Sequence, residues 1–157
     1  MKTTGYILLA VLLLALAACS SPEIEEGHFK DAKALRQSSV FKRGLMPEAF
    51  VDILPPSALD FHYRFSSANT VGHLQFRLTR LPDDYYILIS RMEPALEQEI
   101  EQLRPFGPEG AGWWDAEKVR ANFDSDSFVF RKLPLGVGDA VYIAASEAGE
   151  VYAWVDR

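Results

Sequence analysis

The alternation of apolar and polar residues near the C-terminus predicts a β-hairpin. Segments 141–145 and 151–155 read VYIAA and VYAWV, and a period of two is typical of strands that bury one face. Pairing Val141 with Val155 aligns the apolar positions of the two segments. Gly149 then falls in the turn, where a short hairpin loop needs a left-handed backbone conformation that glycine adopts readily.

A second pair of alternating segments lies nearer the N-terminus. The odd positions of 61–65 are aromatic, and the even positions of 74–79 are apolar. The two apolar sets meet when Tyr63 pairs with Phe76, which leaves the polar residues between the segments for a turn. A bulge at Gly72 would shift this register.

Prolines mark the starts of two predicted helices. Pro47 suits the first turn of a helix over 47–54, and the prolines at 55–56 end it. Pro82, followed by two aspartates, begins the second helix, since carboxylates are favourable at the positive end of the helix dipole.

The second helix is expected to bury one stripe of side chains. This stripe consists of Tyr85, Leu88, Ile89 and Met92. Pro94 breaks the helix, and Leu96, Ile100 and Leu103 continue on another helical segment. A strand at 128–130 joins the C-terminal hairpin. These elements predict an α+β fold in which two hairpins build a small antiparallel sheet and a central helical segment packs on it.

The chain begins with a short basic and then strongly apolar segment. Lys2 precedes 13 residues, 6–18, that carry no charge. As a helix they would extend about 20 Å, which is short of the ~30 Å hydrocarbon core of a bilayer. We therefore expect a secretion signal rather than a membrane span.

The only cysteine follows this apolar segment directly. Leu16, Ala17, Ala18 and Cys19 resemble the lipobox of bacterial lipoproteins. The resemblance implies cleavage before Cys19, a thioether-linked diacylglycerol on its sulfur and an acyl chain such as palmitate on the new amino end. Ser20, rather than an aspartate, follows the cysteine, which resembles the outer-membrane default of enterobacterial lipoproteins. The alternative is an ordinary signal peptide with a coincidental cysteine.

These features divide the chain into three parts. Residues 1–18 are the expected signal peptide, residues 19–43 the lipidated N-terminus and a tether, and residues 44–157 a single globular α+β domain. The tether is expected because 20–27 is polar and acidic, a composition typical of solvated linkers. Several acyl chains would anchor such a protein essentially irreversibly.

Net charge and cysteine content exclude several kinds of chemistry. The chain has 16 Lys+Arg against 22 Asp+Glu, a formal charge of −6, and removing the signal leaves 15 against 22, or −7. Binding to nucleic acid requires a basic stripe, so we expect no nucleic-acid partner. One cysteine permits neither an internal disulfide nor a cysteine-based metal site. Acyl chains must anchor this acidic body, because anionic headgroups repel it.

The titratable residues form no recognised catalytic or metal-binding motif. The expected register places His62 opposite Arg77 and His73 opposite Ser66, and no carboxylate completes a set of metal ligands. We therefore expect the three histidines, including His28, to face solvent. The acidic residues are interpreted as helix-start, solvated-face and turn residues, with weak calcium binding at 124–127 as a minor hypothesis. We predict no catalytic residue, no metal and no cofactor.

Two adjacent tryptophans are the most unusual feature of the body. Trp113 and Trp114 follow Gly112 in a segment rich in glycine and proline. The interpretation that we favour is that they cover an open edge of the core. The alternative is an exposed recognition surface, since tryptophan is enriched at binding hot spots. Tyr152 and Trp154, on the outward face of the C-terminal hairpin, raise the same question, so these four aromatic residues are the candidate binding residues.

Two motifs of the body carry a further resemblance. Residues 54–58 read Leu-Pro-Pro-Ser-Ala and residues 112–114 read Gly-Trp-Trp. With the aromatic strands and the helix between them, they resemble a family of uncharacterised bacterial lipoproteins over most of 47–155. This resemblance implies no particular activity.

The sequence thus predicts a lipid-anchored protein of the bacterial envelope, on the periplasmic face of the outer membrane. Its expected role is non-enzymatic, either binding or an accessory role. The expected partners are the membrane, through Cys19, and a periplasmic protein. The alternative is an immunity or inhibitor protein that neutralises a basic toxin or lytic enzyme by inserting Trp113 or Trp114. A hydrolase is the third hypothesis.

Overall fold

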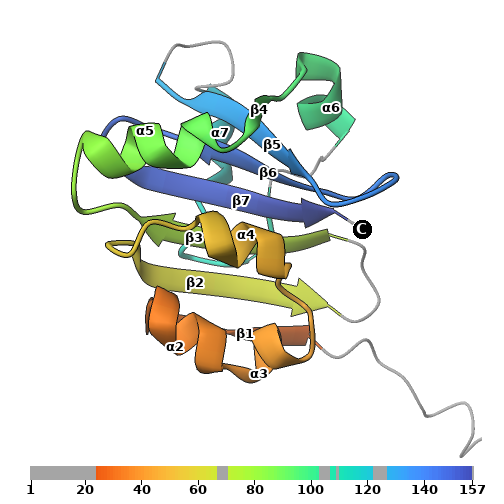
Figure 1. Ribbon diagram of the computed structural model, residues 1–157. Coiled ribbons are helices and arrows are strands. Elements are labelled where there is room, and N and C mark those ends of the chain that lie inside the picture. Colours follow the sequence, from red (N-terminus) through yellow and green to blue (C-terminus); the bar gives the residue numbers. More distant parts are fainter. Residues whose placement is uncertain (1–23, 67–70, 103–106, 109, 122–126, 157) are drawn as a thin grey trace, which may run out of the picture.

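Seven antiparallel strands form one sheet in the computed structural model, which describes residues 24–66, 71–102, 107–108, 110–121 and 127–156. The strand order is β1-β2-β3-β7-β6-β5-β4 (Figure 1). The strands are β1 (Ile24–Asp31), β2 (Leu59–Ser66), β3 (Val71–Arg77), β4 (Glu93–Pro94), β5 (Val129–Pro134), β6 (Ala140–Ala145) and β7 (Glu150–Asp156). The helices are α2 (Ala32–Gln37), α3 (Ser39–Lys42), α4 (Glu48–Ile53), α5 (Asp83–Ser90), α6 (Glu97–Gln102) and α7 (Ala116–Ala121). The predicted α+β class is confirmed, and both predicted hairpins belong to the same sheet.

The C-terminal hairpin has the predicted register. Val141 pairs with Val155, and β5 adds the expected further strand beside β6. Gly149 has a φ angle of 89°, and a Cβ at this position would lie 2.5 Å from the carbonyl oxygen of Leu78. Both the backbone conformation and the lack of space therefore require glycine in this turn.

The register of β2 and β3 differs from the prediction by two residues. Tyr63 pairs with Leu74 rather than with Phe76, and the ladder is irregular between Leu59 and His62 rather than at Gly72. Side chains alternate between the faces of a sheet, so a shift of two residues leaves each of them on its predicted face. The hydrophobic pattern alone cannot distinguish these two registers.

The N-terminal segment differs most from the prediction. Residues 24–42, which the sequence analysis places in the tether, form β1, α2 and α3 and belong to the folded body. Phe29 stacks on Tyr63 of β2 with ring centroids 4.7 Å apart, and Leu35 and Val40 of the two helices are fully buried. β1 is an edge strand with mostly polar exposed residues, as is typical of sheet edges that avoid aggregation. This polarity explains why the segment resembles a linker in the sequence.

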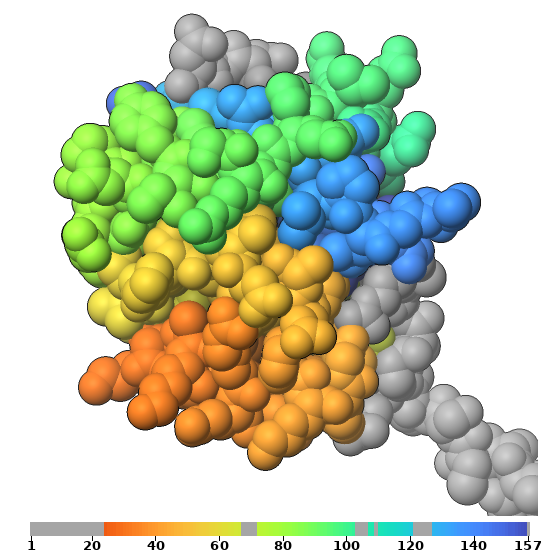
Figure 2. All heavy atoms as spheres, in the orientation of Figure 1, coloured from red at the N-terminus to blue at the C-terminus, as the bar shows by residue number. Residues whose placement is uncertain are grey.

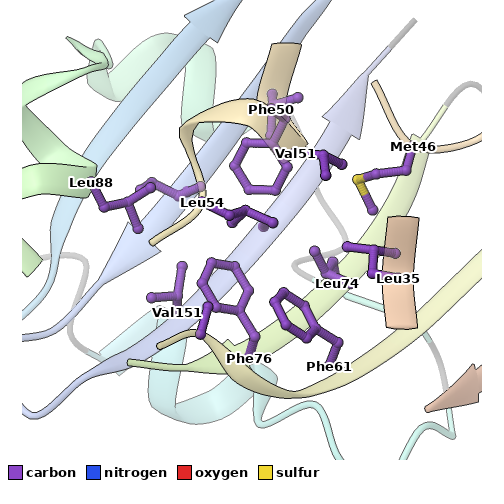
Figure 3. Packing of buried hydrophobic residues seen from close by; sticks show 14 of the residues in the cluster. Leu35, Met46, Phe50, Val51, Leu54, Phe61, Leu74, Phe76, Leu88 and Val151 are labelled. Atoms are coloured by element: carbon purple, nitrogen blue, oxygen red, sulfur yellow. The ribbon is translucent and has the colours of Figure 1, made fainter. Parts of the chain in front are cut away.

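Helices α2–α5 cover one face of the sheet and enclose the main core (Figures 1 and 2). Phe50 of α4 points at the sheet, where its ring meets that of Phe76 in an edge-on contact with centroids 6.4 Å apart (Figure 3). Phe76 in turn stacks on Phe61 at 5.0 Å. The predicted helices at 47–54 and after Pro82 are confirmed as α4 and α5.

Segments that follow α5 cover part of the opposite face, which we call the second face. α5 ends at Ser90 and α6 follows as expected and buries Ile100, so the predicted break is confirmed, and Pro94 itself lies in β4. Leu96 is exposed, and Leu103 lies outside the described residues. No helix within the described ranges has the length and apolar character needed to cross a membrane.

The two turns that flank β6 allow a matched test of the packing at Gly149. Gly138 has a φ angle of 90° and open space where a Cβ would lie, whereas Gly149 has a similar φ angle but a Cβ there would meet Leu78. We expect Gly138→Ala to lower the free energy of unfolding by about 1–2 kcal/mol through backbone strain. Gly149→Ala should lower it by more, since the added methyl group also displaces the end of β3. Urea unfolding measures both variants, and equal losses would contradict the packing described here.

Candidate functional site

The second face of the sheet has a covered part and a partly open part. Residues 110–121 and Ile100 of α6 pack over β5, β6 and β7 and form a second core. The even-numbered residues of β1 and β2 lie on the same face, beside this cover. The candidate binding residues of the sequence analysis fall on both sides of the boundary between the two parts.

Trp114 is part of the second core. It is 7% exposed, and its ring makes edge-on contacts with Tyr152, at 5.1 Å between centroids, and with Trp154, at 5.3 Å. Gly107 packs directly on the indole, where a Cβ would lie 1.9 Å from Nε1. Burial, and then the charge of Glu150, raise the pKa of Tyr152 to about 12. Trp114, Tyr152 and Trp154 therefore cover and fill the core, which is the favoured interpretation, and the structure does not expose them as a recognition surface.

Trp113 lies at the edge of the cover and is only partly buried. Its ring stacks on that of His62, with centroids 5.9 Å apart and an angle of 17° between the planes. Its Nε1–H donates a hydrogen bond to Oε1 of Glu26 at 3.0 Å. Two strands, β1 and β2, thus hold one tryptophan side chain in a defined orientation at the surface.

Two histidines adjoin this tryptophan. His28 of β1 pairs with His62 of β2 in the ladder, and their ring centroids lie 4.6 Å apart. Burial lowers the pKa of His62, and the charge of His28 lowers it further, while Asp60 acts in the opposite direction. Asp60 Oδ1 lies 3.9 Å from Nε2 of His28, whose side chain is 46% exposed.

Ion pairs fix the positions of the charged side chains around these rings. The Nε of Arg64 lies 2.9 Å from Oε2 of Glu26, so both carboxylate oxygens of Glu26 have a partner. Asp60, which has a φ angle of 56°, lies 3.9 Å from Arg77 across the irregular part of the ladder. We refer to Glu26, His28, His62 and Trp113 as the His–Trp patch.

The His–Trp patch combines an aromatic surface with hydrogen-bonding groups and charges of both signs. Such a surface is suited to binding a protein, since oriented tryptophan side chains supply contact area at a low cost in conformational entropy. Within the described residues, no group of three or more His, Cys, Asp or Glu side chains is arranged to hold a metal ion.

The expectation that all three histidines face solvent is wrong for His73. Its ring makes an edge-on contact with Trp114 at 5.3 Å between centroids, and its Nε2 has no hydrogen-bond partner among the described residues. Burial, and then the charge of Arg64, lower the pKa of His73 to about 4. His73 is opposite Arg64 rather than Ser66, because the register differs from the prediction.

Several acidic residues form hydrogen bonds within the fold. The Ser57 hydroxyl donates a hydrogen bond to Asp84, which is buried at the start of α5 rather than solvated. The ammonium group of Lys132 donates to Glu99 at 2.6 Å, and this hydrogen bond lowers the pKa of Glu99. Residues 124–126 of the acidic loop and Cys19 lie outside the described residues.

His73 gives the domain a pH-dependent stability. Its folded-state pKa of about 4 lies below the ordinary 6.5, so the unfolded chain binds more protons between these values. The contribution of neutral His73 is therefore complete above pH 6.5 and is lost as the pH falls toward 4. We expect about 2 kcal/mol less stability at pH 5 than at pH 7.5 from this group. Urea unfolding at both pH values should show a clearly smaller difference for His73→Gln, and an unchanged difference would contradict this assignment.

The two sequence motifs of the body have separate structural roles. Residues 54–58 connect α4 to β2 and link this connection to α5 through Ser57, whereas 112–114 bring Trp113 and Trp114 to the second face. The resemblance to uncharacterised bacterial lipoproteins stays a prediction from these motifs. In comparisons with known proteins, no family model, no curated protein and no solved structure matches this chain.

Proposed function

We propose that this protein is a lipid-anchored protein of the bacterial envelope whose folded body binds a periplasmic protein through the His–Trp patch. The anchor is the diacylglycerol on Cys19 that the lipobox resemblance implies, and the membrane is the periplasmic face of the outer membrane. The proposed role is binding or an accessory role in the envelope rather than catalysis. The observation that carries the binding proposal is the partly exposed Trp113, which His62 and Glu26 hold in place.

The patch has the features of a preorganised binding surface. Trp113 needs little further ordering to meet a partner, because its ring is stacked and its indole N–H is already hydrogen-bonded. Arg64, Arg77 and Asp60 surround the aromatic rings with charges of both signs. A hydrophobic centre with a polar rim is the usual anatomy of protein interfaces.

Inhibition of a basic toxin or lytic enzyme is a narrower form of the same proposal. The charge of −7 on the mature body favours a basic partner. Trp113 is then the residue that contacts the enzyme, because inserting Trp114 would require it to leave Tyr152 and Trp154. The identity of the captured partner distinguishes this form from a general accessory role.

The anchor is tested by Cys19→Ala. This variant cannot carry a thioether-linked lipid, so we expect the protein to move from the membrane fraction to the soluble periplasmic fraction. Incorporation of radiolabelled palmitate should be lost in parallel. Cys19→Ala that still incorporates palmitate would contradict the anchor, and Ser20→Ala serves as a matched control that should remain acylated and anchored.

The binding surface is tested by photo-crosslinking from two lysine positions. Lys30, on the second face of β1, borders the patch, whereas Lys33 is exposed on α2, on the other side of the sheet. A photoreactive side chain at position 30 should give an adduct in living cells, and one at position 33 should not. Trp113→Ala should weaken the captured complex about thirtyfold in Kd, as expected for a hot-spot tryptophan.

Controls for this experiment concern folding. Thermal unfolding of Trp113→Ala shows whether the body remains folded, which we expect because Trp113 lies at the edge of the second core and Trp114 remains in place. Equal adducts from positions 30 and 33, or an adduct that persists unchanged in Trp113→Ala, would contradict binding through the patch.

A further inference from the structure

One end of the sheet gathers the start of β1 and the β5–β6 turn. Antiparallel pairing places Ile24 beside Ser66, and Ala140 beside both Asp156 and Pro134. These strand ends lie on the right of Figure 1. We call this end, from Ile24 to the β5–β6 turn at 135–139, the anchor end.

Two exposed apolar side chains lie at the anchor end. Ile24 is 57% exposed, and Val137 is completely exposed, at 105%. A hydrogen bond of 2.9 Å from the amide of Leu135 to the carbonyl of Asp139 closes the turn that presents Val137, and this turn projects from the molecular surface (Figure 2). The other exposed large hydrophobic residues of the described chain lie on α5 or close to α5 and α6: Leu81, Tyr86, Ile87 and Leu96.

The position of Cys19 determines which end of the body approaches the bilayer. Only four residues separate Cys19 from Ile24, and a chain of this length cannot extend beyond about 18 Å. β1 has eight residues, which span roughly 26 Å along the sheet. Cys19 itself therefore cannot reach the far end of β1, and this favours an approach of the anchor end to the membrane.

The charges at the anchor end do not oppose such an approach as strongly as the net charge suggests. Arg43, which follows α3, forms an ion pair with Glu25 near the start of β1, and Lys42 beside it is exposed. These cations offset part of the negative charge of Glu25, Asp139 and Asp156. The three carboxylates and two cations named here leave a formal charge of −1 among them.

From this geometry we infer that the anchor end rests on the bilayer and that Val137 inserts into the interfacial region of the lipid. This inference rests on the lipidation of Cys19 proposed above. One valine side chain is too small to bind a protein to a membrane, but the acyl anchor makes its insertion an intramolecular step with a high effective concentration. The β5–β6 turn would thus fix the orientation of the body relative to the membrane.

The test measures the depth of two matched probes. Cys19 carries the lipid in the mature protein, so Val137→Cys introduces a unique free thiol for a nitroxide label. Ala148→Cys is the control, because Ala148 is exposed in the β6–β7 turn at the opposite end of the sheet. Each lipidated protein is reconstituted in vesicles of phosphatidylethanolamine and phosphatidylglycerol. Electron paramagnetic resonance then compares collisions with oxygen, which dissolves in lipid, and with a water-soluble nickel chelate.

We expect the ratio of oxygen to nickel collisions at position 137 to be about threefold or more above that at position 148, as for a side chain within the interface. Mass spectrometry of the same samples reports the acyl chains independently. Equal ratios at both positions in lipidated protein would overturn the insertion of Val137 and leave the anchor standing. Protein without acyl chains would overturn the anchor and, with it, the proposed orientation.

Discussion

The packing of Trp114 against the sheet is the contact on which the second face depends. Its ring touches His73 of β3 as well as Tyr152 and Trp154 of β7, so it bridges the two strands that join the halves of the sheet. Gly107 leaves the space that the indole fills. Because Trp113 directly precedes Trp114, the burial of Trp114 also determines where Trp113 meets β1 and β2. A core contact thus positions a surface residue.

The His–Trp patch also depends on the edge strand. β1 supplies Glu26 and His28, and β2 supplies His62. Glu26 uses one oxygen for the indole of Trp113 and the other for Arg64, and it thereby links the cover of the second face to the sheet. Since Ile24 begins the same strand, the patch lies near the anchor end, and in the proposed orientation a protein bound there would lie close to the bilayer.

The accuracy with which the sequence predicts strands and their register differs along the chain. The register of β6 and β7 follows from alternation because glycine marks the turn and apolar pairs match on both sides. The same reasoning misplaces Tyr63 by two residues, because the irregular ladder near Leu59 leaves no mark in the hydrophobic pattern. β1 escapes prediction because an edge strand with mostly polar exposed residues resembles a linker.

The candidate site is harder to predict than the fold. Trp113 and Trp114 stand out by composition, but only the structure distinguishes the buried ring from the partly exposed one. The partnership of His28 and His62 depends on the pairing of β1 with β2, which was not expected. The sequence does contain a signal for strand β1, because Gly27 and Phe29 alternate with charged residues and His28. One large apolar side chain, however, is too little to define a strand.

The strand order has a consequence for the sequence of events in folding. β7, the last strand among the described residues, lies at the centre of the sheet between β3 and β6, so residues 150–156 join the two halves. A chain that emerges from its N-terminus can form the β1–β2–β3 half, but it cannot connect this half to the rest until β7 is available. Contacts between such distant segments are slow to form. If the chain is exported as proposed, the two halves of the sheet would therefore be joined only after residues 150–156 have crossed the membrane.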